Sequence, residues 1–311
     1  MENKSIHLKN RKVLKISGAN CIEFLNNILT SDISKLKPKE ALPSALLSPQ
    51  GRILFYMLVS SNNLNKSLND KSVFVEYDID HQNELIKKLN MYNLRREVTI
   101  EKTSYEVLVT TTNADYPHTL IDKRFFNEVL RRVYIEDQSK IKNNDINDDN
   151  NINWYDLLRY KNCILEGSKE IETNVSLPLE TNLDLLGGIS FDKGCFIGQE
   201  VNARIKWKGV VKRKYVPISI QSKKLSYLKL NNLDKKKIFL ENKEIGEIAC
   251  LSYNKEDDVW YGIAKITLSN LYSFELDKNL EGNFLDSKIK INFPKFMLPL
   301  PKKSKLLRLT N

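Results

Sequence analysis

The stretch FDKGCFIGQEVNARIKWKGVVKRKY, residues 191–215, decides the fold of this 311-residue chain. A lysine, a glycine and a cysteine stand together at 193–195, and a glycine, a glutamine and a glutamate follow at 198–200. Glycine permits sharp backbone turns. We therefore expect a turn that leads into a helix from Phe196 to Ile205, with Cys195 at or just before the first helical turn.

Two interpretations of Cys195 follow from these residues alone. Free cysteines are among the most buried residue types, so a structural thiol is the commoner case. Alternatively, a helix N-terminus and the nearby charge of Lys193 would stabilise a reactive thiolate. Gly198 would let another chain or a ligand approach closely, while Gln199 and Glu200 would cap free backbone N–H groups.

The longer stretch at 177–218 resembles the YgfZ family, which comprises folate-binding relatives of the glycine-cleavage T-protein (aminomethyltransferase) that serve in iron–sulfur cluster assembly. The family hallmark K-G-C-[YF]-x-G-Q-E matches Lys193, Gly194, Cys195, Phe196, Gly198, Gln199 and Glu200. Ala203-Arg204 and Gly209 continue the pattern, and the Pro-Leu-Glu-x-Asn phrase at 178–182 is similar to the mitochondrial members. An eight-position hallmark is far more specific than a lone short motif.

The resemblance implies an α+β fold, with a T-protein-like folate-binding body at 1–209 and a small C-terminal β-barrel at 210–311. It implies an accessory factor for building or repairing iron–sulfur clusters, chiefly of the [4Fe–4S] kind, whose partners are assembly proteins or client enzymes. Cys195 would be the functional thiol, and Lys193 and Arg204 would tune the charge around it.

The resemblance also implies tetrahydrofolate or a derivative as the ligand. Trp154 and Tyr155 would form an aromatic wall, Glu180 would supply an acid and Asn182 an amide. Core packing is the commoner role of aromatic residues on a helix face, and it stays open for the first two. Cations from Arg204 onward would attract an anionic ligand tail.

The sequence departs from the transferase at two places. The transferase carries an aspartate beside the folate nitrogen that receives the one-carbon unit, whereas Phe55 and Tyr56 stand in the matching segment here. Its pterin-binding glutamate corresponds to Lys161, which has no hydrogen-bond acceptor for the amino groups of a pterin. Proton transfer needs a positioned acid or base, so aminomethyl transfer is not expected.

Two other functions stay open. One is a folate-dependent one-carbon transferase that uses a different acceptor. The other is a tRNA-binding factor supporting tRNA modification, because six basic residues and no acid occur at 204–214. Such a run equally suits a solvated strand edge. Its single aromatic residue, Trp207, does not provide the repeated stacking platforms of a single-strand binder.

Composition suggests a globular chain in a reducing compartment, and we expect a cytoplasmic protein. Hydrophobic residues make up 41% and charged residues 28%, and the net charge is +10. Four scattered cysteines and three isolated histidines predict neither a disulfide framework nor a metal site made by this chain alone. No signal segment, transit segment or membrane span is evident.

Hydrophobic periodicity predicts helices at 19–29, 81–92 and 154–164 and strands at 13–16, 72–77, 97–101, 105–111 and within 125–135, and it predicts a turn followed by a strand at 48–60. From residue 210 onward, short β-like runs joined by turns predict the barrel. The polar segment KIKNNDINDDNNIN, residues 140–153, is expected to be an exposed loop.

Overall fold

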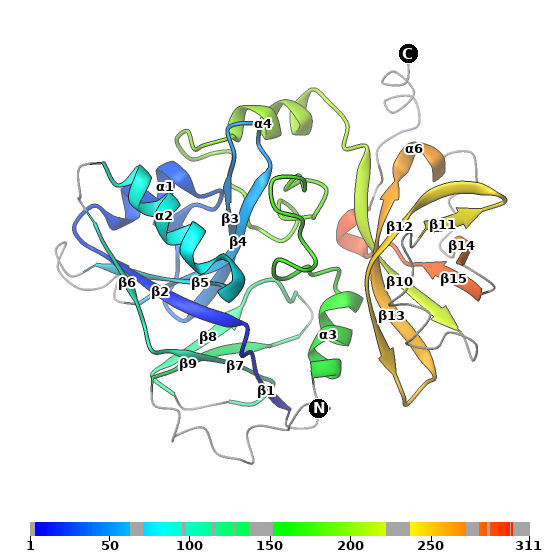
Figure 1. Ribbon diagram of the computed structural model, residues 1–311, viewed down its shortest axis with the longest axis horizontal. Coiled ribbons are helices and arrows are strands. Elements are labelled where there is room, and N and C mark those ends of the chain that lie inside the picture. The colour runs from blue at the N-terminus through cyan, green and yellow to red at the C-terminus, as the bar shows by residue number, and fades with distance from the viewer. Residues whose placement is uncertain are drawn as a thin grey trace. The chain divides into compact units, whose positions relative to one another are not determined.

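The computed structural model describes most of the chain (Figure 1). The described residues are 4–62, 71–94, 98–113, 116–126, 128–136, 152–221, 237–271, 280–284, 287–298 and 300. The polar segment expected to form a loop at 140–153 lies outside them up to residue 151, and its last two residues begin a helix. None of the described helices has the length and apolar character needed to cross a membrane.

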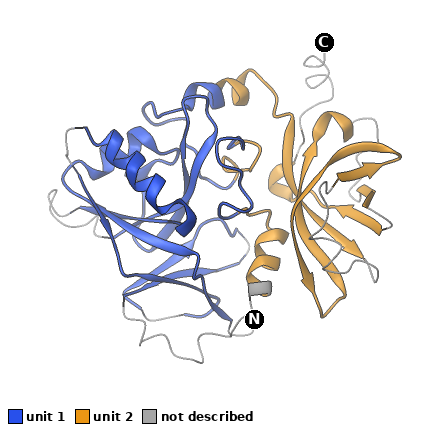
Figure 2. Cartoon of the chain, viewed as in Figure 1, with its two compact units in different colours: residues 1–151, 166–178, 186–203 blue, residues 152–165, 179–185, 204–311 orange. Residues whose placement is uncertain are grey.

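The chain divides into two compact units (Figure 2). Unit 1 contains residues 1–151, 166–178 and 186–203, and unit 2 contains residues 152–165, 179–185 and 204–311. Unit 2 thus takes in two segments that precede the barrel in sequence, so a single cut near residue 209 does not describe the division.

Unit 1 is built on one nine-stranded sheet with the order β1-β7-β9-β8-β3-β4-β5-β2-β6. Its strands are β1 (Ser5–His7), β2 (Arg11–Ser17), β3 (Glu40–Leu47), β4 (Ile53–Ser61), β5 (Ser72–Asp78), β6 (Thr99–Lys102), β7 (Glu106–Thr110), β8 (His118–Asp122) and β9 (Arg131–Ile135). All neighbours pair antiparallel except β3 and β8. The sequence patterns predicted six of these strands but not β1, β3 or β8.

Two helices supply the rest of the core of unit 1. Helix α1 (Cys21–Ile28) and helix α2 (Gln82–Tyr92) lie within the predicted ranges. Their apolar residues share one hydrophobic cluster with strands β2, β4 and β5. In α1 the buried residues are Cys21, Leu25 and Ile28, which recur at helical spacing on one face. Cys21 is therefore a core residue.

Unit 2 contains the barrel that the sequence predicts. Six antiparallel strands close in the order β10-β13-β12-β11-β14-β15. They are β10 (Arg213–Gln221), β11 (Lys237–Leu240), β12 (Lys243–Asn254), β13 (Val259–Thr267), β14 (Leu280–Phe284) and β15 (Ser287–Ile291). Helix α3 (Ile152–Lys161) packs on β10, β12 and β13, and the short α6 (Leu268–Leu271) follows β13. The predicted α+β fold with a small barrel is confirmed.

Helix α4 (Gln199–Trp207) crosses from one unit into the other. It begins three residues later than the predicted start at Phe196. Residues 191–198 before it have no regular structure. The cysteine of the hallmark is consequently placed in a loop rather than at the edge of a helix.

Candidate functional site

Cys195 is the exposed cysteine of the chain. Cys21 and Cys163 are buried, and Cys250 is partly buried in strand β12. Because α4 begins at Gln199, the thiol lies four residues before the helix. The expected position at the helix start is therefore wrong, and so is the support expected for a thiolate from the first helical turn. The interpretation of Cys195 as a buried structural residue does not fit either.

Lys193 fastens the loop on the side before Cys195. Its ammonium group donates to the backbone oxygens of Asn26 at 2.8 Å, Leu29 at 2.5 Å and Ser31 at 2.7 Å, all at the end of α1 and just beyond it. Burial lowers the pKa of Lys193 to about 8, while the charge of Asp32 acts in the opposite direction. This amine is engaged with the backbone of unit 1, which gives it an anchoring role.

A second anchor lies after Cys195, where Gly198 meets the turn at Ser48–Gly51. Gly198 and Gly51 have φ values of 76° and 77°, in the left-handed region that favours glycine. A Cβ atom on Gly198 would lie 2.5 Å from the carbonyl oxygen of Ser48. The close approach expected at Gly198 thus occurs, and its partner is a turn of the same unit.

Asn202 completes this second anchor and was not singled out by the sequence patterns. Its side-chain Nδ2 donates to the carbonyl oxygens of Gly51 at 2.9 Å and Gly198 at 3.0 Å. The residue is fully buried although it lies on a helix that is otherwise largely polar. The available signal was a polar residue four positions after the hallmark glycine, in the first half of the helix that follows it.

The remaining hallmark residues divide between packing and exposure. Phe196 is buried, with the ammonium of Lys193 4.8 Å from its ring centroid. Gln199 accepts from the N–H of Phe196 through Oε1 at 3.3 Å, as its predicted capping role requires. Gly194 is exposed, with no atom within 4 Å of a Cβ built there, and Glu200 is exposed. The backbone is therefore held on both sides of an open Gly194–Cys195 pair.

The four residues expected to bind folate belong to unit 2. The rings of Trp154 and Tyr155 are in edge contact at 6.0 Å on α3, and Tyr155 is buried. Glu180 and Asn182 are buried. Each is hydrogen-bonded to the backbone of Tyr215, which places both beside the start of β10. Glu180 Oε1 also accepts from Arg213 at 2.9 Å. Among the described residues, no partner reaches Trp154 Nε1, Glu180 Oε2 or Asn182 Oδ1.

The basic run at 204–214 is partly neutralised within unit 2. Asp184 pairs with Lys206 at 2.9 Å and with Lys214 at 3.9 Å, and Glu180 pairs with Arg213. Arg204 is exposed, and Trp207 is 68% exposed at the end of α4. Three of the six cations thus have acidic partners that come from a segment preceding the run.

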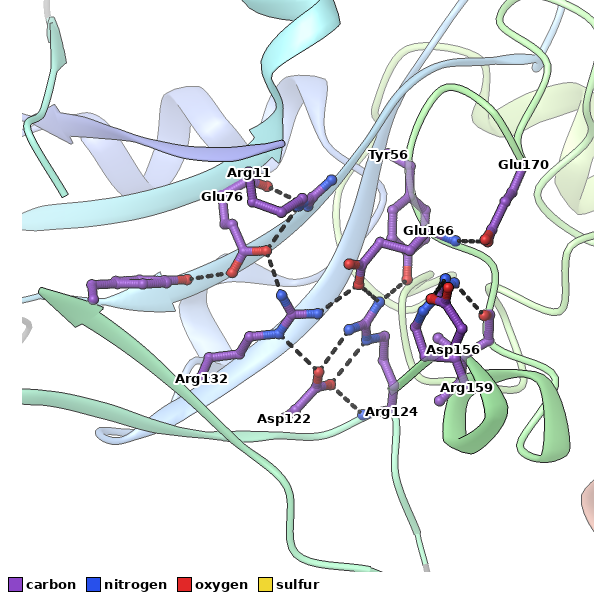
Figure 3. A network of polar contacts seen from close by, with 12 residues as sticks. Arg11, Tyr56, Glu76, Asp122, Arg124, Arg132, Asp156, Arg159, Glu166 and Glu170 are labelled. Carbon is purple, nitrogen blue, oxygen red and sulfur yellow. Dashed lines mark hydrogen bonds and ion pairs between the residues drawn. The ribbon is translucent and has the colours of Figure 1, made fainter. Parts of the chain in front are cut away.

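A network of buried ion pairs lies in unit 1 (Figure 3). Three arginines alternate with three acids, with N–O distances from 2.5 to 3.2 Å, and the members are Arg11, Glu76, Arg132, Asp122, Arg124 and Glu166. Each charge has at least one oppositely charged partner, which lowers the cost of burying it. Tyr56 accepts from Arg124 at 3.4 Å, and burial raises the pKa of its hydroxyl.

Phe55 and Tyr56, which stand in the segment where the sequence resemblance leads us to look for the transferase acid, are both buried. In the segment that matches the pterin-binding glutamate, the Lys161 ammonium lies 4.4 Å from the ring centroid of Tyr261. Within the described ranges, no three His, Cys, Asp or Glu side chains gather closely enough to hold a metal ion.

Comparison with known proteins gives two kinds of relative. No family model matches the chain. The mitochondrial "Iron-sulfur cluster assembly factor IBA57 homolog" of Neurospora crassa is 26% identical over 231 residues, which cover 68% of this chain and 52% of that protein. The homolog of Dictyostelium discoideum is 24% identical over 262 residues, covering 70% and 63%. The chain thus spans roughly half to two thirds of the length of these curated relatives.

The fold has a solved counterpart. The crystal structure of glycine cleavage system aminomethyltransferase T from Bartonella henselae superimposes with a TM-score of 0.70 and covers 94% of this chain and 86% of its own. The sequences are only 12% identical, so the likeness concerns the fold alone. It confirms the predicted T-protein-like architecture.

The relatives also correct the expected location. Their names place them in mitochondria, which overturns the prediction of a cytoplasmic protein. The prediction depended on scattered, unpaired cysteines, which indicate a reducing environment. That property does not distinguish one reducing compartment from another.

Proposed function

We propose that this protein assists the assembly of iron–sulfur clusters and that Cys195 is its working thiol. The observation that carries the proposal is the arrangement of the loop: an exposed cysteine on a backbone anchored before it by Lys193 and after it by Gly198. The similarity to curated cluster assembly factors supports the same role.

The chemistry of clusters explains why such an arrangement suits this work. Clusters are held by cysteine thiolates, and a thiolate that receives and passes on a cluster must be reachable by another protein. An exposed thiol on a fixed backbone meets this need, because little conformational entropy is lost when a ligand bond forms. The cluster is the cargo, received from or delivered to an assembly protein or a client enzyme.

The test is depletion of the protein followed by rescue in the same cells. We expect the intact chain to restore the activity of [4Fe–4S] enzymes of the aconitase and radical-SAM types, and Cys195→Ala to restore less than about a tenth of it. Cys250→Ala is the matched control, since it removes a thiol from the barrel. Full rescue by Cys195→Ala at equal protein level would refute the role of this cysteine.

We also propose that unit 2 contributes residues to a tetrahydrofolate site. Buried polar groups normally have hydrogen-bond partners, so an unmatched buried atom suggests that a ligand supplies one. Glu180 Oε2 and Asn182 Oδ1 are unmatched acceptors and Trp154 Nε1 is an unmatched donor among the described residues. A pterin ring carries both donors and acceptors, which fits this set. Bound tetrahydrofolate would supply a reduced pterin able to carry a one-carbon unit.

Calorimetric titration with tetrahydrofolate tests the ligand separately from the thiol. We expect saturable binding that Asn182→Leu weakens about tenfold, because it removes an acceptor from a buried site. Asn242→Leu, in the exposed turn between β11 and β12, is the control and should bind as the intact chain does. Absence of binding at high micromolar ligand would refute the folate proposal and leave the role of Cys195 untouched.

A further inference from the structure

Two buried residues of unit 2 that contact each other both have a left-handed backbone. Cys163 has a φ of 55° and Asn182 a φ of 63°, and both are fully buried. Residues other than glycine seldom adopt this conformation, because Cβ then crowds the following carbonyl oxygen. Such strain persists where the surrounding structure holds the residue in place. The contacts of the two side chains show what holds them.

Cys163 ends helix α3 at the position that glycine usually takes. The N–H of Cys163 donates to the carbonyl oxygen of Tyr160 at 3.0 Å, and the N–H of Ile164 donates to that of Arg159 at 2.9 Å. This pair of bonds is a Schellman motif, whose left-handed residue is most often glycine. The chain has a cysteine there instead, so its sulfur is present despite the preference of the local backbone.

The sulfur of Cys163 belongs to a cluster of polar groups around one carbonyl oxygen. The thiol donates to the backbone oxygen of Tyr215 at 3.1 Å, and Asn182 Nδ2 donates to the same oxygen at 2.9 Å. Asn182 Nδ2 also donates to the sulfur at 3.4 Å. Burial raises the pKa of the Cys163 thiol, so the S–H proton that the first bond requires is retained at neutral pH.

These contacts determine which way the Asn182 amide is turned. Turning it over would place Oδ1 against the oxygen of Tyr215, and two acceptors would then face each other without a proton between them. Oδ1 is therefore kept on the other branch of the amide, where it is buried and no described residue donates to it. Glu180, two residues earlier, is arranged alike: its Oε1 accepts from Arg213 at 2.9 Å, while its Oε2 is buried and unmatched among the described residues.

Two unmatched acceptors restrict the chemistry of a ligand. A buried acceptor without a partner is costly, and a ligand that donates to it removes this cost. A ligand with an acceptor at the same point leaves the cost in place. Among pteridines, the 2-amino-4-oxo ring carries an amino donor where the 2,4-dioxo ring carries an oxygen. The orientation of the Asn182 amide thus favours the amino form.

We propose that Cys163 is a positioning residue for ligand binding by unit 2, and that it acts through Asn182 to select a pteridine with an amino donor. Its sulfur and the carbonyl group of Tyr215 hold the amide, and Asn182 Oδ1 receives the amino group. The thiol itself does not touch the ligand and undergoes no reaction. The identity of the ligand rests on the tetrahydrofolate site proposed above, whereas the orientation of the amide does not.

The selectivity test compares pterin with lumazine, its 2,4-dioxo analogue, by calorimetry on the full chain. We expect the intact chain to bind pterin about tenfold more tightly, because lumazine leaves the acceptor unmatched. Cys163→Ala keeps Cβ and removes the sulfur, so only one of the two bonds that hold Nδ2 remains, and the ratio of affinities should fall about threefold. Cys163→Ser, whose hydroxyl donates to the same carbonyl oxygen, should keep most of the ratio.

Cys21→Ala is the matched control. Cys21 is a buried cysteine of unit 1 whose sulfur also donates to a backbone oxygen, that of Lys71 at 3.5 Å. This variant should lose stability without a change in the ratio. A merely structural role of Cys163 would weaken both ligands equally, so an unchanged ratio in Cys163→Ala would overturn the inference and leave the folate proposal in place.

A second measurement needs no ligand. In NMR spectra, the side-chain N–H protons of Asn182 should exchange with water about tenfold faster in Cys163→Ala than in the intact chain, because one of their acceptors is gone. Equal exchange rates would overturn the positioning role of Cys163 for any ligand. Failure of the intact chain to bind both pterin and tetrahydrofolate would refute the folate proposal and the selectivity for an amino group, and the exchange rates would still decide the positioning role.

Discussion

The thiols of Cys163 and Cys195 lie in opposite environments: the first is buried and hydrogen-bonded, and the second is exposed. Cys163, after α3 in unit 2, is buried, donates through its sulfur to the backbone oxygen of Tyr215 at 3.1 Å and receives Asn182 at 3.4 Å. Burial raises the pKa of its thiol far above the usual value. Cys195 in unit 1 is exposed, and the hydrogen bonds around it belong to its neighbours in the loop.

The two segments differ in which atoms form the hydrogen bonds: the sulfur itself or the residues around it. At Cys163 they are made by the sulfur atom itself, so the thiol is immobilised and kept protonated. Around Cys195 they are made by Lys193, Gln199 and Asn202, so the backbone is fixed while the thiol stays available. A cysteine of the second kind can do chemistry at the surface without a mobile loop.

Alkylation of the folded chain should show the largest difference. With iodoacetamide at neutral pH, we expect Cys195 to react on the order of a thousandfold faster than Cys163, because burial excludes the reagent and disfavours the thiolate. Peptide mass spectrometry of timed samples measures both rates. In strong denaturant the two rates should converge to within a few fold. Similar rates in the folded chain would erase the contrast between the two segments.

Substituting the glycine anchor should give the next largest effect. Gly198→Ala introduces a Cβ at a φ of 76° and 2.5 Å from a carbonyl oxygen, so we expect a loss of about 2 kcal/mol in unfolding free energy. Gly194→Ala has open space around it and should change stability by less than about 0.5 kcal/mol. Urea unfolding of both variants measures the difference. Equal stability of the two would contradict the close packing of Gly198.

Removing the lysine anchor should have a smaller effect. Lys193→Met keeps most of the side-chain volume but loses three hydrogen bonds to backbone oxygens, and we expect a cost of about 1.5 kcal/mol. Amide hydrogen exchange at residues 194–196 should become faster, whereas exchange in the barrel should not change. Unchanged exchange in the loop would show that Lys193 does not hold it, and would leave this residue with the expected role of tuning the charge around Cys195.

Local patterns in the sequence predicted the elements that pack through their own periodicity. The helices at 19–29 and 81–92 and the barrel after residue 210 are of this kind. Strand β3 was missed because Pro43 interrupts its pattern, although the strand accommodates the proline by pairing with β8 only at Glu40 and Ala41.

The hallmark located the loop that holds Cys195, but it did not predict the contacts that its other residues make. Gly198 depends on a turn 150 positions earlier in the chain, and Lys193 depends on carbonyl groups at the end of α1. The buried network of arginines and acids, drawn from strands far apart in sequence, left no local trace either. Such contacts become visible only when the fold brings distant segments together.

The smallest expected effect is the pH dependence of the unfolding free energy, which tests the protonation state in which Lys193 anchors the loop. Burial lowers its pKa in the folded chain to about 8, below the ordinary value of 10.5. Between these values the unfolded chain binds more protons than the folded one, so the stability of the intact chain should rise with pH relative to that of Lys193→Met. The neutral amine still donates to two of its carbonyl partners, and the cost of burying a charge disappears. We therefore expect the stability deficit of Lys193→Met, relative to the intact chain, to grow from pH 8 to pH 10 in urea unfolding.

Gly194→Ala is the control for this measurement. It retains the lysine, so its unfolding free energy should follow that of the intact chain at every pH. A stability deficit of Lys193→Met that shrinks over this range would show that the three carbonyl groups stabilise the ammonium form.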